Sequence, residues 1–195
     1  MFDLFYNDSM RYKKEEIAAI DKISFATTKL ILTNGYHDVN ISDIIKEAGV
    51  SRSTFYIYFK NKEQITTRIC DHILDHVFSR HLFEEKGQDF SQYSDSNLKD
   101  IIIRSFKNFS DEGELVLSIL DSGASSIFLK RLRMQLDKLI ITMINRKIIG
   151  NNDIPEEIKI HQYIIGYTTL LQYFLRNKYK VKPEKIAEYY FELYK

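Results

Sequence analysis

The sequence predicts an all-α protein, and three observations support this fold class. Apolar residues recur with helical spacing along nearly the whole chain; between Ile65 and Val77, for example, every fourth residue is apolar. No long alternating run flanked by turn residues suggests a strand. The 195 residues include only 2 Pro and 7 Gly, too few for a sandwich or barrel with many turns.

The predicted helices are separated by recognisable breaks. Gly35 follows the first helix and suits a left-handed cap. Later breaks lie at Gly49, residues 84–97, residues 121–123, residues 150–155 and just before Pro183. One later helix has a clear apolar face made of Leu132, Leu136, Leu139, Ile140, Met143 and Ile144.

Length and composition narrow the class of protein. A chain of 195 residues allows one domain, or a small domain attached to a larger one. Hydrophobic residues make up 44%, enough for a real core. The net charge of +1 gives no global attraction for a polyanion, so a nucleic-acid function must rest on a local motif. The single cysteine excludes a disulfide framework and a zinc site built from thiolates of one chain.

Membrane insertion and export are not expected. No apolar run approaches the ~18 residues that a membrane helix needs. Asp3 and Asp8 interrupt the apolar residues at the start of the chain, which is unlike the core of a signal peptide. We therefore expect no membrane partner and a cytoplasmic protein.

The most informative stretch is residues 40–62, which is typical of two short helices joined by a glycine turn. Asn40 is a good N-cap, and Asp43 can complete a reciprocal cap. Gly49 permits the tight turn, and Ser51 then caps a second short helix. In that helix the aromatic residues 55 and 59 lie on one side and face inward.

The other side of the second helix carries groups suited to a DNA groove. Arginine can bond the edge of a guanine, whereas hydroxyl and ammonium groups bond phosphate oxygens. Residues 50–68 contain four positive side chains and one negative one, so the basic character lies at the motif. A helix–turn–helix corner in an ordinary bundle, with Tyr56 and Tyr58 at its rim, is the alternative interpretation. The outward residues are Arg52, Ser53, Thr54, Tyr56, Tyr58, Lys60 and Lys62.

Residues 48–63 read AGVSRSTFYIYFKNKE, and with the preceding Gly35-Tyr36 they resemble the DNA-binding domain of TetR-type transcriptional regulators. The resemblance covers about 50 residues. Ile45 stands where the family usually has Ala, and Ile31 where it often has Phe. Both positions remain apolar, so we expect local repacking.

This resemblance implies specific roles and a partner. It implies a homodimer that places two recognition helices in successive major grooves of a near-palindromic double-stranded DNA operator. Residues 1–62 would form an N-terminal extension plus a three-helix DNA-binding domain, and residues 63–195 a helical ligand-binding and dimerisation domain. The base-contacting positions match Arg52 and Ser53, and the phosphate-side positions match Thr54, Tyr56, Tyr58 and Lys62.

The later part of the chain, at residues 106–132 and 166–177, is similar to a TetR-family branch common in low-GC Gram-positive bacteria. That branch usually has Trp near Tyr173, and this chain has none. Residues 163–175 are apolar nearly all round, so this helix needs burial on two sides. We favour a partner subunit on one side over a helix central in a monomer. The expected dimer residues are Tyr163, Tyr167, Leu170, Phe174 and Tyr190.

The family further implies a small-molecule effector bound in the later domain. Large apolar side chains on the central helices are the candidates for its pocket, and each of them also fits an ordinary core position. No charged residue can be assigned to the pocket, so the polarity of the effector is open. The candidates are Phe106, Phe109, Phe128, Met134, Met143 and Tyr167.

Other chemistry is not expected. His72 and His76 share a helix face with acidic neighbours, which fits a solvated face better than a metal site because no distant third ligand is evident. Redox sensing by Cys70 stays open. No catalytic constellation or phosphate loop is present, so we expect no enzyme, cofactor or metal. The favoured function is a ligand-responsive dimeric repressor; the alternative is a coactivator or regulator of the same fold controlled by a protein partner.

Overall fold

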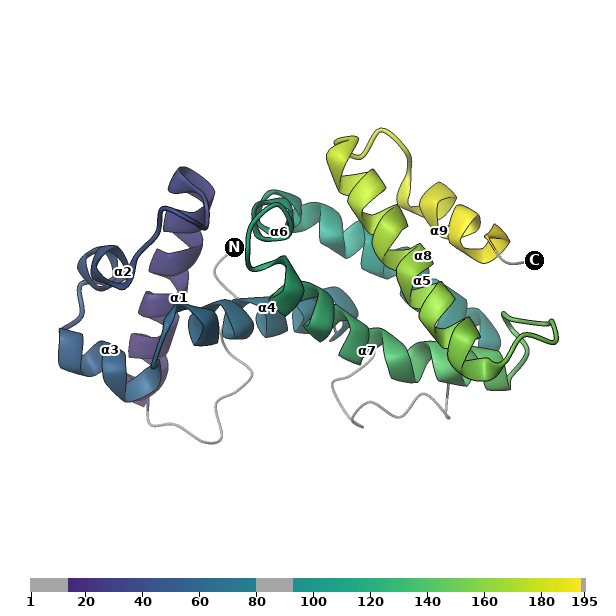
Figure 1. The fold of residues 1–195 in the computed structure, drawn as a ribbon, viewed down its shortest axis with the longest axis horizontal. Helices are drawn as coiled ribbons and strands as arrows, with labels where there is room; N and C mark the ends of the chain where they lie inside the picture. Colours follow the sequence, from purple (N-terminus) through teal and green to yellow (C-terminus); the bar gives the residue numbers. More distant parts are fainter. Residues whose placement is uncertain (1–13, 80–92, 194–195) are drawn as a thin grey trace. The chain divides into compact units, whose positions relative to one another are not determined.

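The computed structural model describes residues 14–79 and 93–193 (Figure 1). These residues form nine helices and no strand, which confirms the predicted all-α class. The predicted N-terminal extension up to residue 13, and most of the polar segment 84–97 that was expected as a loop, lie outside the described residues.

Packing divides the chain into two compact units. The first comprises Met1–Ile73 and Glu114–Phe128, and the second Leu74–Gly113 and Leu129–Lys195. The first unit therefore takes in a later segment of the chain that the sequence pattern did not assign to it. The division of the chain into functional domains after residue 62 stays a prediction.

The first unit is built on α1, which packs against α2 and α3. Ile23, Ile31, Ile44 and Phe55 are fully buried in its core. Ile31 is buried, and the expected local repacking around it stays a prediction. The elements are α1 (Lys14–Asn34), α2 (Ile41–Ala48), α3 (Arg52–Tyr58), α4 (Lys62–Ser79) as far as Ile73, α6 (Gly113–Leu120) after its first residue, and the start of α7 (Ser125–Asn145).

Two hydrogen bonds fix the inserted segment of the first unit to the end of α1 and the turn after it. Ser118 Oγ donates to the carbonyl oxygen of Ile31 at 3.4 Å. The N–H of Gly123 donates to Nε2 of His37 at 3.3 Å. The second of these hydrogen bonds therefore connects the turn between α6 and α7 to the turn that leads into α2.

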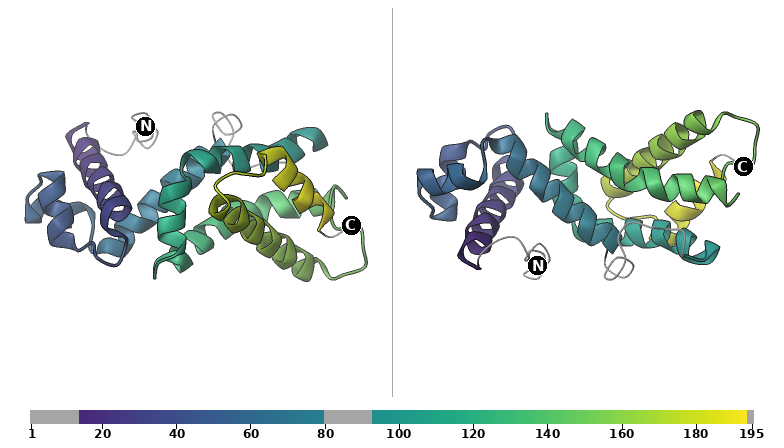
Figure 2. Two further views of the ribbon diagram at one scale, coloured as in Figure 1. Left: turned by 90° about the horizontal axis from the view of Figure 1, so that it is seen from above. Right: turned by 90° about the horizontal axis from the view of Figure 1, so that it is seen from below.

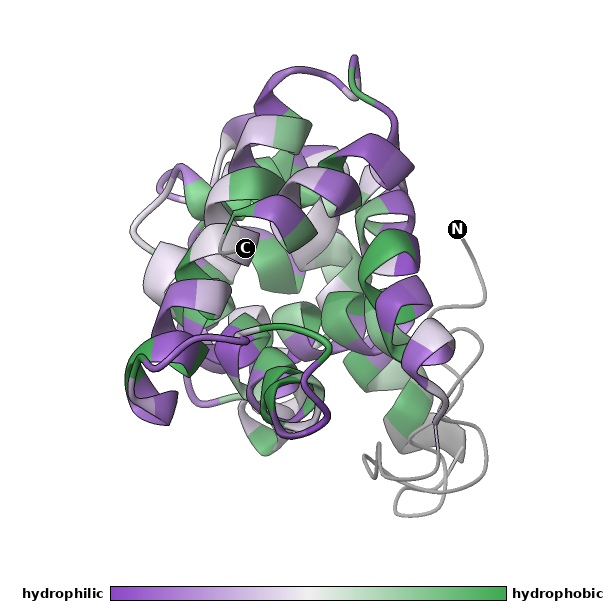
Figure 3. Ribbon diagram, turned by 90° about the vertical axis from the view of Figure 1, so that its right-hand side faces the viewer, coloured by the Kyte–Doolittle hydropathy of each residue, from purple (hydrophilic) through white to green (hydrophobic). Residues whose placement is uncertain are grey.

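The second unit is built on α5 (Asp95–Asp111), α8 (Glu156–Arg176) and α9 (Pro183–Glu192), which pack on one another (Figure 2). Pro183 opens α9 as predicted. The start of α5 corrects the predicted loop, which was expected to reach residue 97. The helix begins at Asp95 because the Ser94 hydroxyl caps it. Hydrophobic and hydrophilic residues interleave along the helices (Figure 3).

A buried hydroxyl pair lies inside the second unit. Tyr167 is fully buried and stacks on Phe106 with ring centroids 4.8 Å apart. Ser105 Oγ lies 2.5 Å from Tyr167 Oη and donates its own proton to the carbonyl oxygen of Ile102 at 2.7 Å. Tyr167 is therefore the donor in the hydroxyl pair. Burial raises the pKa of Tyr167 well above its ordinary value, so the phenol stays neutral.

The turn after α8 packs against Gly113, the first residue of α6. Lys178 and Tyr179 both have left-handed backbones, with φ of 50° and 59°, which is uncommon for residues with a side chain. The Tyr179 ring packs on Phe174 at 5.2 Å between centroids. Its hydroxyl occupies the space beside Gly113, where an added Cβ would lie 1.8 Å from Oη. A side chain at position 113 would therefore have to displace the Tyr179 hydroxyl.

Candidate nucleic-acid interface

The turn between α2 and α3 is fixed by local hydrogen bonds. Asn40 Oδ1 accepts from the Asp43 N–H at 3.1 Å, and the Asp43 carboxylate accepts from the Asn40 N–H at 3.2 Å. Gly49 has the left-handed φ of 63° that ends α2. Ser51 Oγ then accepts from the Thr54 N–H at 3.0 Å and starts α3. All of these predicted caps are confirmed.

Two buried aromatic side chains set the orientation of α3. Phe55 is fully buried and Phe59 is 5% exposed, and their rings pack 6.2 Å apart. Their burial on one side turns the opposite side of this short helix to solvent. The exposed residues on α3 are Arg52, Ser53, Tyr56 and Ile57, whereas Thr54 and Tyr58 are half-buried.

Hydroxyl groups cluster at the start of α3. Ser51 Oγ lies 2.8 Å from Ser53 Oγ and 2.7 Å from Thr54 Oγ1. Because Ser51 also accepts from the backbone, its hydroxyl is held in place within the cap. Ser53 remains exposed and therefore presents a hydroxyl that can donate to, or accept from, a base edge or a phosphate.

Arg52 and Tyr56 form one exposed pair. The guanidinium carbon of Arg52 lies 5.8 Å from the centroid of the Tyr56 ring, within the range of a cation–π contact. Tyr56 packs edge-on against Phe55 at 5.2 Å and is 44% exposed. The buried Phe55 thus supports Tyr56, which in turn steadies the arginine that we expect to contact a base.

Lys62 has a structural role that the sequence pattern did not suggest. Its ammonium donates to the carbonyl oxygens of Tyr36 and Val39, both at 2.8 Å, and lies 4.1 Å from the centroid of the Tyr36 ring. Partial burial lowers the pKa of the Lys62 amine, and the charge of Asp38 opposes this shift. Lys62 therefore fastens the start of α4 to the turn before α2. Its predicted phosphate contact would use the third N–H and stays a prediction.

Ile57 is a residue of this surface that the sequence analysis missed. It is 73% exposed, the largest exposure among the large hydrophobic residues that the structure describes. The signal was present in the sequence, because Ile57 follows Ser53 by four residues and so shares its side of α3. It was overlooked because an isoleucine in a short helix is usually assigned to the core.

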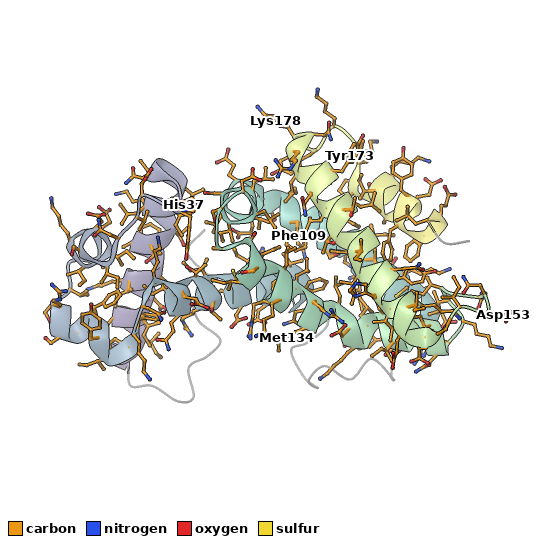
Figure 4. The ribbon with its side chains drawn as sticks, viewed as in Figure 1. His37, Phe109, Met134, Asp153, Tyr173 and Lys178 are labelled. Carbon is orange, nitrogen blue, oxygen red and sulfur yellow. The ribbon has the colours of Figure 1, made fainter. Side chains whose placement is uncertain are left out.

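The predicted effector-pocket residues are not all buried. Phe106, Phe109 and Met143 are fully buried in the second unit with Tyr167, whereas Phe128 is buried in the first unit. Met134 is 51% exposed and points away from the helices, whereas Phe109 lies among them (Figure 4). As a surface residue in the described structure, Met134 does not line the interior of its unit. The six residues predicted for the effector pocket are Phe106, Phe109, Phe128, Met134, Met143 and Tyr167.

The predicted dimer residues require a correction. Four of them, Tyr163, Tyr167, Phe174 and Tyr190, are at most 3% exposed within a single chain, and only Leu170 is half-buried. Their rings fill the space between α8 and its neighbours; Tyr190, for example, lies 5.8 Å from both Tyr163 and Tyr167. Side chains buried in this way are not available to a partner.

The opposite side of α8 carries the exposed apolar residues. Ile158, Ile165 and Tyr173 are 48–49% exposed. Their spacings of seven and eight residues place them on one helix face. The exposed polar residues His161, Thr169 and Arg176 lie on the same side. Burial of this helix on two sides therefore stays a prediction, and the residues on its outer side differ from the predicted ones.

The described residues were compared with the requirements of a metal site and of a membrane-spanning helix. In residues 14–79 and 93–193, no group of three or more His, Cys, Asp and Glu side chains could hold a metal ion. Cys70 is buried. None of the described helices is long and apolar enough to cross a membrane.

The arrangement of α1, α2 and α3, with polar groups outward on α3, defines a helix–turn–helix protein. A family model described as "Bacterial regulatory proteins, tetR family" matches residues 24–69. A second, described as "Transcriptional regulator C-terminal region", matches residues 96–195, just over half of the chain. The chain belongs to the TetR family of transcriptional regulators.

Curated relatives agree with this assignment. The chain is 36% identical over 75 residues to the "Fatty acid metabolism regulator protein" of Bacillus subtilis, covering 38% of this chain and 32% of that one. It is 27% identical over 130 residues to the dhaKLM operon transcriptional activator DhaS of Lactococcus lactis, covering 65% and 63%. The matches span less than two thirds of both relatives. Their sources are consistent with the predicted Gram-positive branch.

Solved structures share the fold. A TetR transcriptional regulator from Streptococcus agalactiae superposes with a TM-score of 0.71 at 23% identity, covering 92% of this chain and 94% of that one. The fatty acid degradation regulator FadR from Bacillus halodurans superposes with a TM-score of 0.63 at 18% identity, covering 90% of this chain and 93% of that one. The proteins and families matched are transcriptional regulators and not enzymes, in agreement with the prediction.

Proposed function

We propose that the protein is a ligand-responsive, dimeric transcriptional regulator that represses genes by binding a near-palindromic operator. The observation that carries this proposal is the exposed side of α3. There Arg52, Ser53 and Tyr56 face solvent on a helix anchored by buried aromatic rings. These groups match the donors and acceptors that the major groove offers.

Dimerisation supplies the two-fold symmetry that such an operator requires. The stripe of Ile158, Ile165 and Tyr173 on α8 is half-exposed in the single chain. Exposed apolar and aromatic side chains gathered on one side of a helix are typical of an interface, and the polar residues His161, Thr169 and Arg176 on this side would lie among them. We assign this face to a second copy of the chain, so that two α3 helices are presented to successive grooves.

The effector would bind in the second unit and shift the population between two dimer geometries. The interior there combines buried rings of Phe106, Phe109 and Tyr167 with a hydroxyl at Ser105. If these groups line the effector site, they suit a ligand with an apolar body and one polar group. A repressor with this mechanism acts where the bacterial chromosome lies, in the cytoplasm.

Binding-site selection from random duplexes tests the proposal directly. We expect enrichment of a two-fold symmetric sequence and an affinity that falls steeply with salt through counterion release. Replacing Arg52 and Tyr56 by Ala should weaken binding by about 30- to 25,000-fold, because the dimer loses one base contact, worth about 1–3 kcal/mol, in each of its two half-sites. Lys107→Ala, which removes an exposed charge from α5, is the matched control. Selection of no duplex would contradict the proposal and favour a regulator that acts through a protein partner.

Activation is the second candidate for the sign of regulation. It is favoured by one observation: the Lactococcus lactis relative, which matches 65% of this chain, is named a transcriptional activator. A reporter gene downstream of the selected operator distinguishes the two functions. Repression lowers reporter output when the protein is present, whereas activation raises it.

A further inference from the structure

The exposed surface of α3 contains one aliphatic side chain that the described residues leave mostly in solvent. Ile57 is 73% exposed, while Phe55 and Phe59 on the other side of the helix are buried. Turning Ile57 inward would expose both phenylalanines, so the packing of α3 keeps it in solvent. Burying an isoleucine side chain ordinarily stabilises the fold, and Ile57 does not contribute this stabilisation in the free chain.

The place of Ile57 on the helix relates it to the other outward groups. It lies four residues after Ser53 and five after Arg52. At about 100° and 1.5 Å per residue, Ile57 lies on nearly the same side as Ser53, and its backbone is about 6 Å further along the helix axis. This distance corresponds to about two base-pair steps of 3.4 Å along a groove that α3 follows.

Major-groove chemistry offers Ile57 one specific match. The edges of guanine, adenine and cytosine present only hydrogen-bonding groups there, whereas thymine also presents its apolar 5-methyl group. We propose that Ile57 is a specificity-determining residue that contacts the 5-methyl group of a thymine about two base pairs from the base pair that Ser53 faces. This inference rests on the proposed DNA-binding function.

Deoxyuridine provides the test, because it differs from thymidine only in lacking the 5-methyl group. Each thymine of the selected operator is replaced in turn, and affinity is measured for the wild-type protein and for Ile57→Ala. We expect one thymine in each half-site whose replacement weakens wild-type binding by about fourfold, the contribution of one buried methyl group, and by about fifteenfold with both half-sites replaced. Ile57→Ala should bind the thymine operator less tightly and should show no penalty at that position.

Two further variants sharpen the comparison. Ile57→Val keeps a branched apolar side chain and should retain most of the deoxyuridine penalty. Leu32→Ala removes an apolar side chain that is 44% exposed on α1 of the same unit, and should leave the pattern of penalties unchanged. Thermal unfolding should give the same Tm for Ile57→Ala and wild type, because the removed atoms are largely in solvent.

The outcomes separate this inference from the proposed function. A selected operator for which wild type and Ile57→Ala show the same deoxyuridine penalties, or which contains no sensitive thymine, overturns the role of Ile57 and leaves DNA binding intact. Equal weakening of Ile57→Ala on thymine and deoxyuridine operators indicates contact with the sugar–phosphate backbone and also overturns it. Selection of no duplex overturns both proposals.

Discussion

Replacing Lys62 by Met removes an ammonium group and keeps a side chain of similar length, so it tests the contact between the start of α4 and the turn before α2. The ammonium donates to two carbonyl oxygens, those of Tyr36 and Val39, at 2.8 Å each. Both bonds are part-buried, so water compensates some of the loss. At about 0.5–1.5 kcal/mol per bond, the free energy of unfolding should fall by about 1–3 kcal/mol.

Thermal unfolding at equal protein concentration measures this effect. For a chain of this size each kcal/mol corresponds to about 2–4 °C in Tm. Lys60→Met is the matched control, because the exposed Lys60 uses its backbone N–H, not its ammonium, to bond Gln64 at 2.7 Å. The control should change the free energy of unfolding by less than about 0.5 kcal/mol. Equal Tm values for the two variants would refute a structural role of Lys62.

The same variant tests the predicted phosphate contact of Lys62. If its third N–H bonds a phosphate, the slope of log affinity against log salt should decrease in magnitude by about 0.9 for each half-site in Lys62→Met. A lower Tm with an unchanged salt slope would show that Lys62 joins α4 to the turn before α2 and does not contact a phosphate. Stability and salt slope thus report on separate roles of one side chain.

Three further predictions concern the interior. Ser105→Ala should cost about 1–3 kcal/mol because it leaves the buried Tyr167 hydroxyl without its acceptor, whereas Tyr167→Phe should cost about 0.5–1.5 kcal/mol, both measured by denaturant unfolding. Gly113→Ala should lower the free energy of unfolding by about 1–3 kcal/mol through overpacking, and by less when Tyr179 is also replaced by Ala. Additive effects of the two substitutions would contradict the close contact between Gly113 and Tyr179. Burial raises the pKa of the Asp21 carboxyl group, although the charge of Arg68 opposes this shift. The protonated carboxyl group therefore stabilises the fold fully below pH 3.8, and this stabilisation is lost as the pH rises through the raised pKa. Asp21→Asn should gain stability relative to wild type over that window, and a constant difference from pH 3 to 8 would exclude this cause.

The sequence was informative where structure is decided within a few residues. The caps at Asn40 and Ser51 each join a side chain to a backbone N–H three residues later, so their residue types alone predict the bonds. The left-handed turn at Gly49 has the same local origin. Lys62 was different, because its partners Tyr36 and Val39 are 26 and 23 residues away and ordinary carbonyl groups give no sequence signal.

Position on the helix explains why Met134 does not fit a pocket. The apolar face of α7 contains Leu132 and Leu136, and Met134 lies two residues from each of them. At about 100° per residue it is rotated by about 200° from both, to the opposite side of the helix. Its exposure of 51% follows from that rotation. Residue type had suggested a pocket, whereas periodicity already placed this methionine outside.

Helix α8 shows that large apolar residues on both sides of a helix obscure which side is exposed. The polar residues His161, Thr169 and Arg176 mark the exposed side, but the sequence also places Ile165 and Tyr173 on it. The side that packs against α5 and α9 is chosen by volume and shape, and it receives the rings of Tyr163, Tyr167 and Phe174. The remaining side keeps Ile165 and Tyr173 half-exposed. A dimer variant should therefore be made at those two positions, because substitution of the buried rings would unfold the subunit before it could report on association.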